Sequence, residues 1–115
     1  MKDKYLSSRE RLIHIQKAIS DIEKFLDNNG EKDFTENELL HNAVLMQFII
    51  IGEAINNVEE GILEKYAYPW YKVRAFRNLI AHEYFNIKLS AVWNIIQNEL
   101  NSLKTMINEI LNNEF

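Results

Sequence analysis

Two side chains close together in the C-terminal half could do chemistry, Arg77 and His82, with Tyr84 two residues further on. They lie in the segment Arg77-Asn78-Leu79-Ile80-Ala81-His82-Glu83-Tyr84, which we call the motif. A guanidinium group can hold a phosphate through two parallel hydrogen bonds. An imidazole, with an ordinary pKa of about 6.5, can move a proton near neutral pH. Because an amphipathic helix needs neither group, the motif is the candidate site of this chain.

This pair of residue types fits the cleavage of RNA without a metal. In that reaction the 2′-hydroxyl loses a proton, the leaving 5′-oxygen gains one, and negative charge grows on the phosphate. His82 could transfer the protons, and Arg77 could stabilise the charge. The chain has no nearby second histidine and no carboxylate pair with metal-site spacing, so we expect neither a metal nor a cofactor. The alternatives are that His82 is merely exposed and that Tyr84 is a packing aromatic.

The spacing within the motif raises a geometric difficulty. Five residues of helix turn through about 500°, so Arg77 and His82 diverge by about 140°. They can meet if the helix ends near Ala81, if the Arg77 side chain swings widely, or if the site forms across a two-fold axis. Asn78 lies four residues before His82, where it could orient the imidazole.

The elements that must position the motif are predicted to be helices. Three glycines and one proline leave little material for turns, and good helix formers dominate the composition. Capping patterns and apolar periodicity predict four main helices, from Ser7 to Gly30, from Thr35 to about Gly61, from near Pro69 through the motif, and from Asn86 or Ser90 to about Asn112. We therefore expect one all-α domain over residues 1–115, an up-and-down four-helix bundle with a short extra helix.

The second predicted helix is apolar around nearly its whole circumference between residues 43 and 51. Such a helix is buried on more than one side, so we expect a homodimer; the alternative is that the other helices cover it fully. Gly52 and Glu53 interrupt the apolar run. Close approach of another helix would explain the glycine, and we expect Glu53 to pair with an arginine.

Positive charge is concentrated around the motif. Residues 65–88 hold five bases and one acid, a net charge of +4, whereas the rest of the chain holds eight bases and sixteen acids, a net charge of -8. We expect Lys72 and Arg74 to help bind RNA phosphates. A solvated basic face would show the same distribution.

The composition also bears on the compartment. The chain has no cysteine, as expected in a reducing cytoplasm. It opens on charged residues rather than an apolar signal segment. The longest apolar run, Phe48-Ile49-Ile50-Ile51, is too short to span a bilayer. We therefore expect a cytoplasmic protein that does not bind membranes.

The motif resembles the R-x4-H-x-Y signature of the HepT-like branch of the HEPN domains. Three other segments are similar to that family and lie in the same order: the Gly-Glu-Ala element of the second helix, the lead-in to the motif and its continuation, that is Ile51-Gly52-Glu53-Ala54, Pro69 to Phe76, and Asn86-Ile87 through Val92-Trp93. The resemblance covers the whole chain.

The resemblance implies an all-α HEPN fold and a homodimer whose motif lines a cleft at the interface. It implies metal-independent endoribonuclease activity with Arg77 and His82 as catalytic residues. Many HepT-like proteins are toxins silenced by an MntA-like nucleotidyltransferase antitoxin, which transfers AMP from ATP to the motif tyrosine, here Tyr84. Two alternatives remain: a non-catalytic substrate- or nucleotide-binding partner subunit of a minimal nucleotidyltransferase, and a purely structural dimer.

Overall fold

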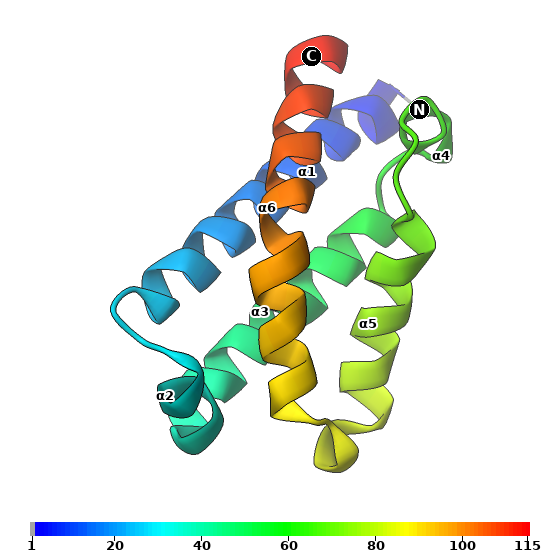
Figure 1. Cartoon of the computed structure of the whole chain (residues 1–115). Helices are drawn as coiled ribbons and strands as arrows, with labels where there is room; N and C mark the ends of the chain where they lie inside the picture. Colours follow the sequence, from blue (N-terminus) through cyan, green and yellow to red (C-terminus); the bar gives the residue numbers. More distant parts are fainter. Residues whose placement is uncertain (1) are drawn as a thin grey trace.

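The structure is a computed structural model that describes residues 2–115, and the side chains from Ser7 onward. Four long helices alternate in direction along the bundle (Figure 1). They are α1 (Lys2–Leu26), α3 (Glu38–Asn56), α5 (Trp70–His82) and α6 (Leu89–Glu114). Three short elements join them, α2 (Glu31–Glu36), α4 (Glu60–Leu63) and the 3-10 helix η1 (Tyr84–Asn86). No strand occurs in residues 2–115, so the all-α prediction is confirmed.

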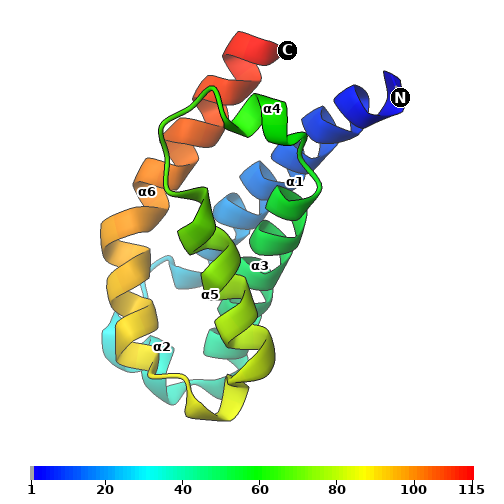
Figure 2. The ribbon, with the colours of Figure 1, turned by 90° about the vertical axis from the view of Figure 1, so that its right-hand side faces the viewer.

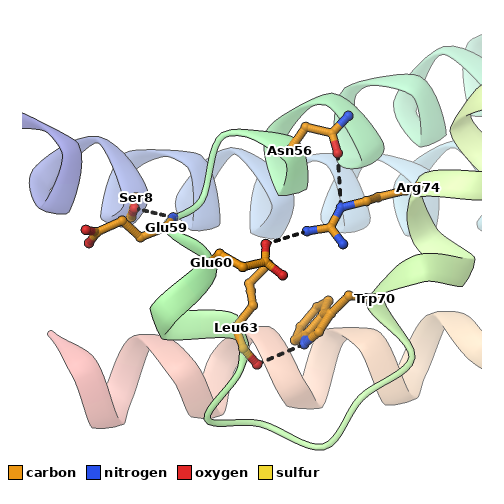
Figure 3. A network of polar contacts seen from close by, with 7 residues as sticks. All are labelled: Ser8, Asn56, Glu59, Glu60, Leu63, Trp70 and Arg74. Carbon is orange, nitrogen blue, oxygen red and sulfur yellow. Dashed lines mark hydrogen bonds and ion pairs between the residues drawn. The ribbon is translucent and has the colours of Figure 1, made fainter.

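The predicted start of the first helix is wrong. The helix α1 begins at Lys2, and Ser7 lies inside it. The neighbouring Ser8 is fully buried, and its Oγ accepts a hydrogen bond from the backbone N–H of Glu59 at 2.9 Å (Figure 3). Ser8 therefore contacts the turn that leads into α4, and Ser7 does not cap α1 because the helix begins five residues earlier.

The predicted start of the second helix is also wrong. Asn37, not Thr35, caps α3, since the Asn37 Oδ1 accepts a hydrogen bond from the Leu40 N–H at 3.0 Å. Thr35 lies in α2, where its hydroxyl bonds to the Lys32 carbonyl oxygen at 3.2 Å. The fully buried Phe34 holds this extra turn against the bundle, so burial of one aromatic ring decides the boundary.

The helix α3 lies between α1 and α5, and α1 also packs against α6 (Figure 2). Its buried residues point towards these neighbours, namely Val44, Leu45, Phe48, Ile51, Gly52, Ala54 and Ile55. Over 18 residues its mean hydropathy reaches 1.4, a value shared by the core helices of bundles and by helices that cross membranes. Its place between two packed helices is that of a core helix.

The helices α3 and α5 approach each other closely at Gly52. A Cβ atom built on Gly52 would lie 2.2 Å from the Cβ of Arg77 and 2.6 Å from its Cγ. It would also lie 3.5 Å from the carbonyl oxygen of Val73. No larger residue fits without moving α5, so the expectation of a close helix approach at Gly52 is confirmed.

Polar contacts fix the start of α5 (Figure 3). The indole N–H of Trp70 donates to the carbonyl oxygen of Leu63 at 3.1 Å. One turn later, Arg74 donates from Nε to Asn56 Oδ1 and from Nη2 to Glu60 Oε2, each at 3.1 Å. These contacts join α5 to α4 and to the end of α3, and they set the direction in which α5 runs towards the motif.

A second cluster ties the end of α6 to the connection before α5. Glu114 accepts from Lys65 Nζ at 3.0 Å and from the Tyr66 hydroxyl at 2.8 Å. Two hydrogen bonds lower the pKa of the Glu114 carboxyl. The one from Lys65 has the larger effect and the one from Tyr66 the smaller. The pKa of the Tyr66 hydroxyl is raised, mainly by burial and to a smaller extent by its hydrogen bond to Glu114. The Glu114 contribution to stability is therefore present at neutral pH and is lost as the pH falls through its lowered pKa.

The Gly52 crossing yields a stability prediction. The Gly52→Ala variant should lose about 1–3 kcal/mol of unfolding free energy in urea titrations, because its new methyl group overlaps the stem of Arg77. Gly61→Ala is the matched control, since a Cβ atom on Gly61 in α4 would meet nothing within 4 Å. A Gly52→Ala protein as stable as the Gly61→Ala control would contradict the close crossing.

Candidate active site

Arg77 is held along its whole length. Its stem packs on Gly52, its Nη2 donates to Glu53 Oε2 at 2.7 Å, and its Nη1 donates to Asn78 Oδ1 at 3.2 Å. The Nε is buried and has no hydrogen-bond partner in the described part of the chain. The side chain as a whole is 27% exposed. The predicted pairing of Glu53 with an arginine is thus confirmed, and the guanidinium is fixed while part of it stays accessible.

Asn78 contacts Arg77 rather than His82. Its side-chain oxygen accepts from the guanidinium, and no hydrogen bond joins it to His82 among the described residues. The predicted role of Asn78 in orienting the imidazole is therefore not seen in this structure. Its bond instead helps to hold the Arg77 head group.

His82 is the last residue of α5, and its side chain is exposed. It makes no hydrogen bond or ion pair with any residue that the structure describes. Its backbone is fixed by the buried Ile80 and by the Glu83 N–H, which donates to the Leu79 carbonyl oxygen at 2.8 Å. The imidazole is thus free to contact another molecule.

The structure narrows the ways in which Arg77 and His82 could meet. The helix α5 ends at His82, one residue beyond Ala81, so Arg77 and His82 both keep helical positions and diverge by about 140°. Glu53 and Asn78 hold the guanidinium in place, so the arginine does not swing widely. Of the three geometries considered, the one across a two-fold axis agrees best with these contacts.

Tyr84 lies in η1 and is 42% exposed. Its hydroxyl donates a hydrogen bond to the side-chain oxygen of Asn42 on α3, and its ring meets the Phe85 ring edge-on. Asn42 was not predicted as a site residue, because a lone asparagine near the start of a helix carries no motif. On α3, Asn42 precedes Glu53, the partner of Arg77, by eleven residues, or about 16 Å along the helix.

One face of α3 remains uncovered by the bundle and is apolar. Leu39, Met46 and Ile50 are 82%, 53% and 38% exposed, and two further apolar side chains are exposed nearby in the chain after Arg77, Leu79 on α5 and Phe85 in η1. We call these five residues the α3–α5 surface. Helical spacing places Asn42 and Glu53 on the same face of α3, so the contacts that hold Arg77 and Tyr84 border this surface.

The positive charge around the motif is largely compensated. Three of its five bases form ion pairs with carboxylates from other segments, in the pairs Lys65–Glu114, Arg74–Glu60 and Arg77–Glu53. Lys72 and Lys88 make no ion pair within the described residues. The local field is therefore weaker than the sequence count of +4 suggests.

Lys72 and Arg74 lie on different faces of α5. Lys72 lines a cavity of about 350 Å³ between α5 and α6, whose walls include Phe48 and Phe76. Arg74 instead contacts Asn56 and Glu60 on the α3 side. The two predicted phosphate-binding residues are not brought together. Within residues 2–115, no group of three or more His, Asp or Glu is placed to hold a metal ion.

An all-α bundle in which an Arg-x4-His-x-Tyr motif closes the third long helix has the fold and the motif of the HEPN class. The family model described as "Ribonuclease HepT-like" matches residues 15–110. The chain belongs to this HepT-like ribonuclease family, as the resemblance predicted.

Relatives with ribonuclease names support this assignment. The chain is 32% identical over 84 residues to "Putative RNase TTE0752" of Caldanaerobacter subterraneus, covering 72% of this chain and 75% of the relative. It is 28% identical over 99 residues to "Probable ribonuclease HepT" of Thermococcus cleftensis, covering 85% and 90%. No solved structure matches the chain.

One relative is much longer than this chain. "Gamma-glutamylcyclotransferase and putative RNase MJ0434" of Methanocaldococcus jannaschii is 33% identical over 101 residues, which cover 87% of this chain and 46% of the relative. The chain thus spans about half the length of that protein.

Proposed function

We propose that this protein is a metal-independent endoribonuclease, the toxin of a toxin–antitoxin pair, that acts in the cytoplasm as a homodimer. Arg77 binds the scissile phosphate and His82 transfers protons. The proposal rests on one observation: in this member of the HepT-like ribonuclease family, Arg77 and His82 lie on the same helix but differ in how firmly their side chains are held. Arg77 is fixed by Gly52, Glu53 and Asn78, whereas His82 is exposed and unpartnered among the described residues.

The proposed reaction uses groups that this protomer presents. The bonds to Glu53 and Asn78 occupy only part of the guanidinium, so N–H groups on Nη1 and Nη2 remain for non-bridging phosphate oxygens. The 2′-oxygen loses its proton and forms a bond to phosphorus, while the bond from phosphorus to the 5′-oxygen breaks. His82 takes the proton of the 2′-hydroxyl while water protonates the leaving 5′-oxygen, or His82 protonates the 5′-oxygen while water takes the first proton.

The α3–α5 surface supports the homodimer. Exposed apolar side chains on one face of α3, with Leu39 at 82% exposure, are typical of a site of association. In a two-fold dimer each copy presents the same surface to the other. Because Arg77 and Tyr84 contact Glu53 and Asn42 on this face of α3, association could bring His82 of one protomer towards Arg77 of its partner and overcome the divergence of about 140° along α5.

The proposed silencing acts on Tyr84. An MntA-like nucleotidyltransferase antitoxin would transfer AMP from ATP to the Tyr84 hydroxyl, which is partly exposed beside the same surface. The attached nucleotide would place a bulky anion where the second copy or the RNA has to fit. Modification would then stop cleavage without unfolding the bundle.

One observation favours the alternative of a non-catalytic partner subunit of a minimal nucleotidyltransferase. The carboxylates paired with Lys65, Arg74 and Arg77 reduce the positive field that would attract RNA. A binding subunit needs a phosphate-binding arginine but no proton-transfer group, so the requirement for His82 separates the two functions.

The first functional prediction concerns cleavage. His82→Ala should lower the rate of RNA cleavage by at least about 100-fold, with an unchanged melting temperature because the side chain is exposed. The matched control is His14→Ala, another exposed histidine, on α1. Cleavage should persist in EDTA. Full activity of His82→Ala, or activity only with added magnesium, would refute the mechanism.

The second prediction concerns association. Ile50→Asp should shift the protein from dimer to monomer in sedimentation experiments at micromolar concentration, since it places a charge in the α3–α5 surface. Phe25→Asp is the matched control, because Phe25 is 37% exposed on α1 whereas Ile50 is 38% exposed on α3. Ile51 is 1% exposed, so a charge there would unfold the bundle instead. A wild-type monomer would contradict the proposal.

The third prediction concerns Tyr84. After incubation with the MntA-like partner and ATP, intact-mass and peptide mass spectrometry should find AMP on Tyr84. Tyr84→Phe should retain measurable cleavage that the partner cannot silence, because the acceptor oxygen is gone. Tyr71→Phe, 67% exposed on α5, is the control and should be silenced like the wild type. An adduct on another residue would count against the proposal.

A further inference from the structure

We infer that Asn42 is a positioning residue for His82, acting through the hydroxyl of Tyr84. The inference rests on the proposed role of His82 in cleavage. It starts from the hydrogen bond that the Tyr84 hydroxyl donates to the Asn42 side-chain oxygen, which joins the turn after α5 to α3.

The imidazole of His82 depends on its backbone for its position. Its side chain has no hydrogen bond or ion pair with the described residues, and both of its neighbours, Ala81 and Glu83, are exposed. Two residues before it, Ile80 is 2% exposed and anchors α5 in the core. Two residues after it, Tyr84 bonds to Asn42. His82 therefore lies between two points at which the chain is attached to the bundle, the buried side chain of Ile80 and the hydrogen bond between Tyr84 and Asn42.

The hydrogen bond between Tyr84 and Asn42 holds the turn less strongly than the buried Ile80 does, and a single substitution removes it. Phe85, which follows Tyr84, is 94% exposed and adds no burial to this turn, and none of the three residues of η1 is buried. Without the bond to Asn42, the turn would be held to the bundle by Ile80 before it and by the partly buried Ile87 after it. An imidazole displaced by about 1 Å can cost up to about 100-fold in rate.

Asn42 and the residues that hold Arg77 belong to the same helix. The Arg77 stem packs on Gly52 and its head group pairs with Glu53, while Tyr84 bonds to Asn42 near the other end of α3. Both functional side chains of one chain are therefore held, directly or through Tyr84, by the same helix, α3.

This arrangement also explains how modification of Tyr84 could act. In AMP transfer, the Tyr84 oxygen forms a bond to the α-phosphorus of ATP, the bond from that phosphorus to the β-phosphate bridge breaks, pyrophosphate leaves, and the phenolic proton passes to solvent. The Asn42 oxygen can only accept a hydrogen bond. The modified tyrosine has no proton to donate, so the bond to Asn42 is lost and the turn that carries His82 is released.

The test is a set of steady-state measurements with a single-stranded RNA substrate. Asn42→Ala should lower kcat about tenfold and leave KM nearly unchanged, because Arg77 keeps all its contacts. Asn42→Asp retains an acceptor oxygen and should restore most of the rate. Gln47→Ala is the control, a partly buried polar residue of α3 with no side-chain hydrogen bond to described residues, and its kcat should match the wild type.

The double variant separates positioning from general stability. Tyr84→Phe should lower kcat by the same factor as Asn42→Ala, and combining the two changes should cause no further loss, because both remove one hydrogen bond. Additive losses, or an unchanged kcat in Asn42→Ala, would overturn the inference while leaving the proposed function intact.

Amide hydrogen exchange gives a readout that does not depend on activity. The amides of residues 81–86 should exchange several-fold faster in Asn42→Ala than in the wild type and the Gln47→Ala control, while those around Arg77 should be unchanged. Equal exchange rates would overturn the inference. If His82→Ala proved fully active, the proposed function would fail, and this experiment would still decide whether Asn42 holds the turn.

Discussion

The close crossing of α3 and α5 at Gly52 is the contact on which the candidate site depends. A glycine at this place lets the stem of Arg77 lie against the α3 backbone, and Glu53, the next residue, then receives the guanidinium. The same crossing sets the direction of α5, and hence the place where His82 ends the helix and Tyr84 meets Asn42. A glycine in mid-helix lowers helix stability by about 1 kcal/mol relative to alanine. At Gly52 the missing side chain leaves the space that the Arg77 stem occupies.

Holding Arg77 so firmly has an electrostatic consequence. The carboxylate that positions the guanidinium also cancels its charge, and Glu60 does the same for Arg74. A phosphate that binds Arg77 gains a pre-positioned donor group but has to share it with Glu53, and the field that draws RNA from solution is small. The guanidinium of Arg77 is therefore held in a fixed position, but its charge attracts a distant phosphate only weakly. Such a group suits the recognition of a few phosphates at close range.

Much of this arrangement could be predicted from the sequence. Apolar periodicity identified the four long helices, Gly52 indicated a close helix contact, and Glu53 beside apolar residues indicated a pairing with an arginine. The predicted caps at Ser7 and Thr35 were wrong because a local pattern cannot foresee that Ser8 bonds to Glu59 or that Phe34 is buried. The Tyr84–Asn42 bond and the carboxylate partners of Lys65 and Arg74 join residues far apart in the chain, so no local spacing could reveal them.

In the single chain no hydrogen bond joins Arg77 to His82 among the described residues, and we propose that a second copy, docked on the exposed apolar face of α3, completes the site. Mixing two inactive variants, Arg77→Ala and His82→Ala, tests this most directly. After subunit exchange, the mixed dimer has one site with an intact arginine from one protomer and an intact histidine from the other. We predict that the equimolar mixture regains RNA cleavage at about a quarter of the wild-type rate, since random exchange makes half of the dimers mixed with one intact site each. A mixture that exchanges subunits but stays inactive would contradict a site shared between protomers.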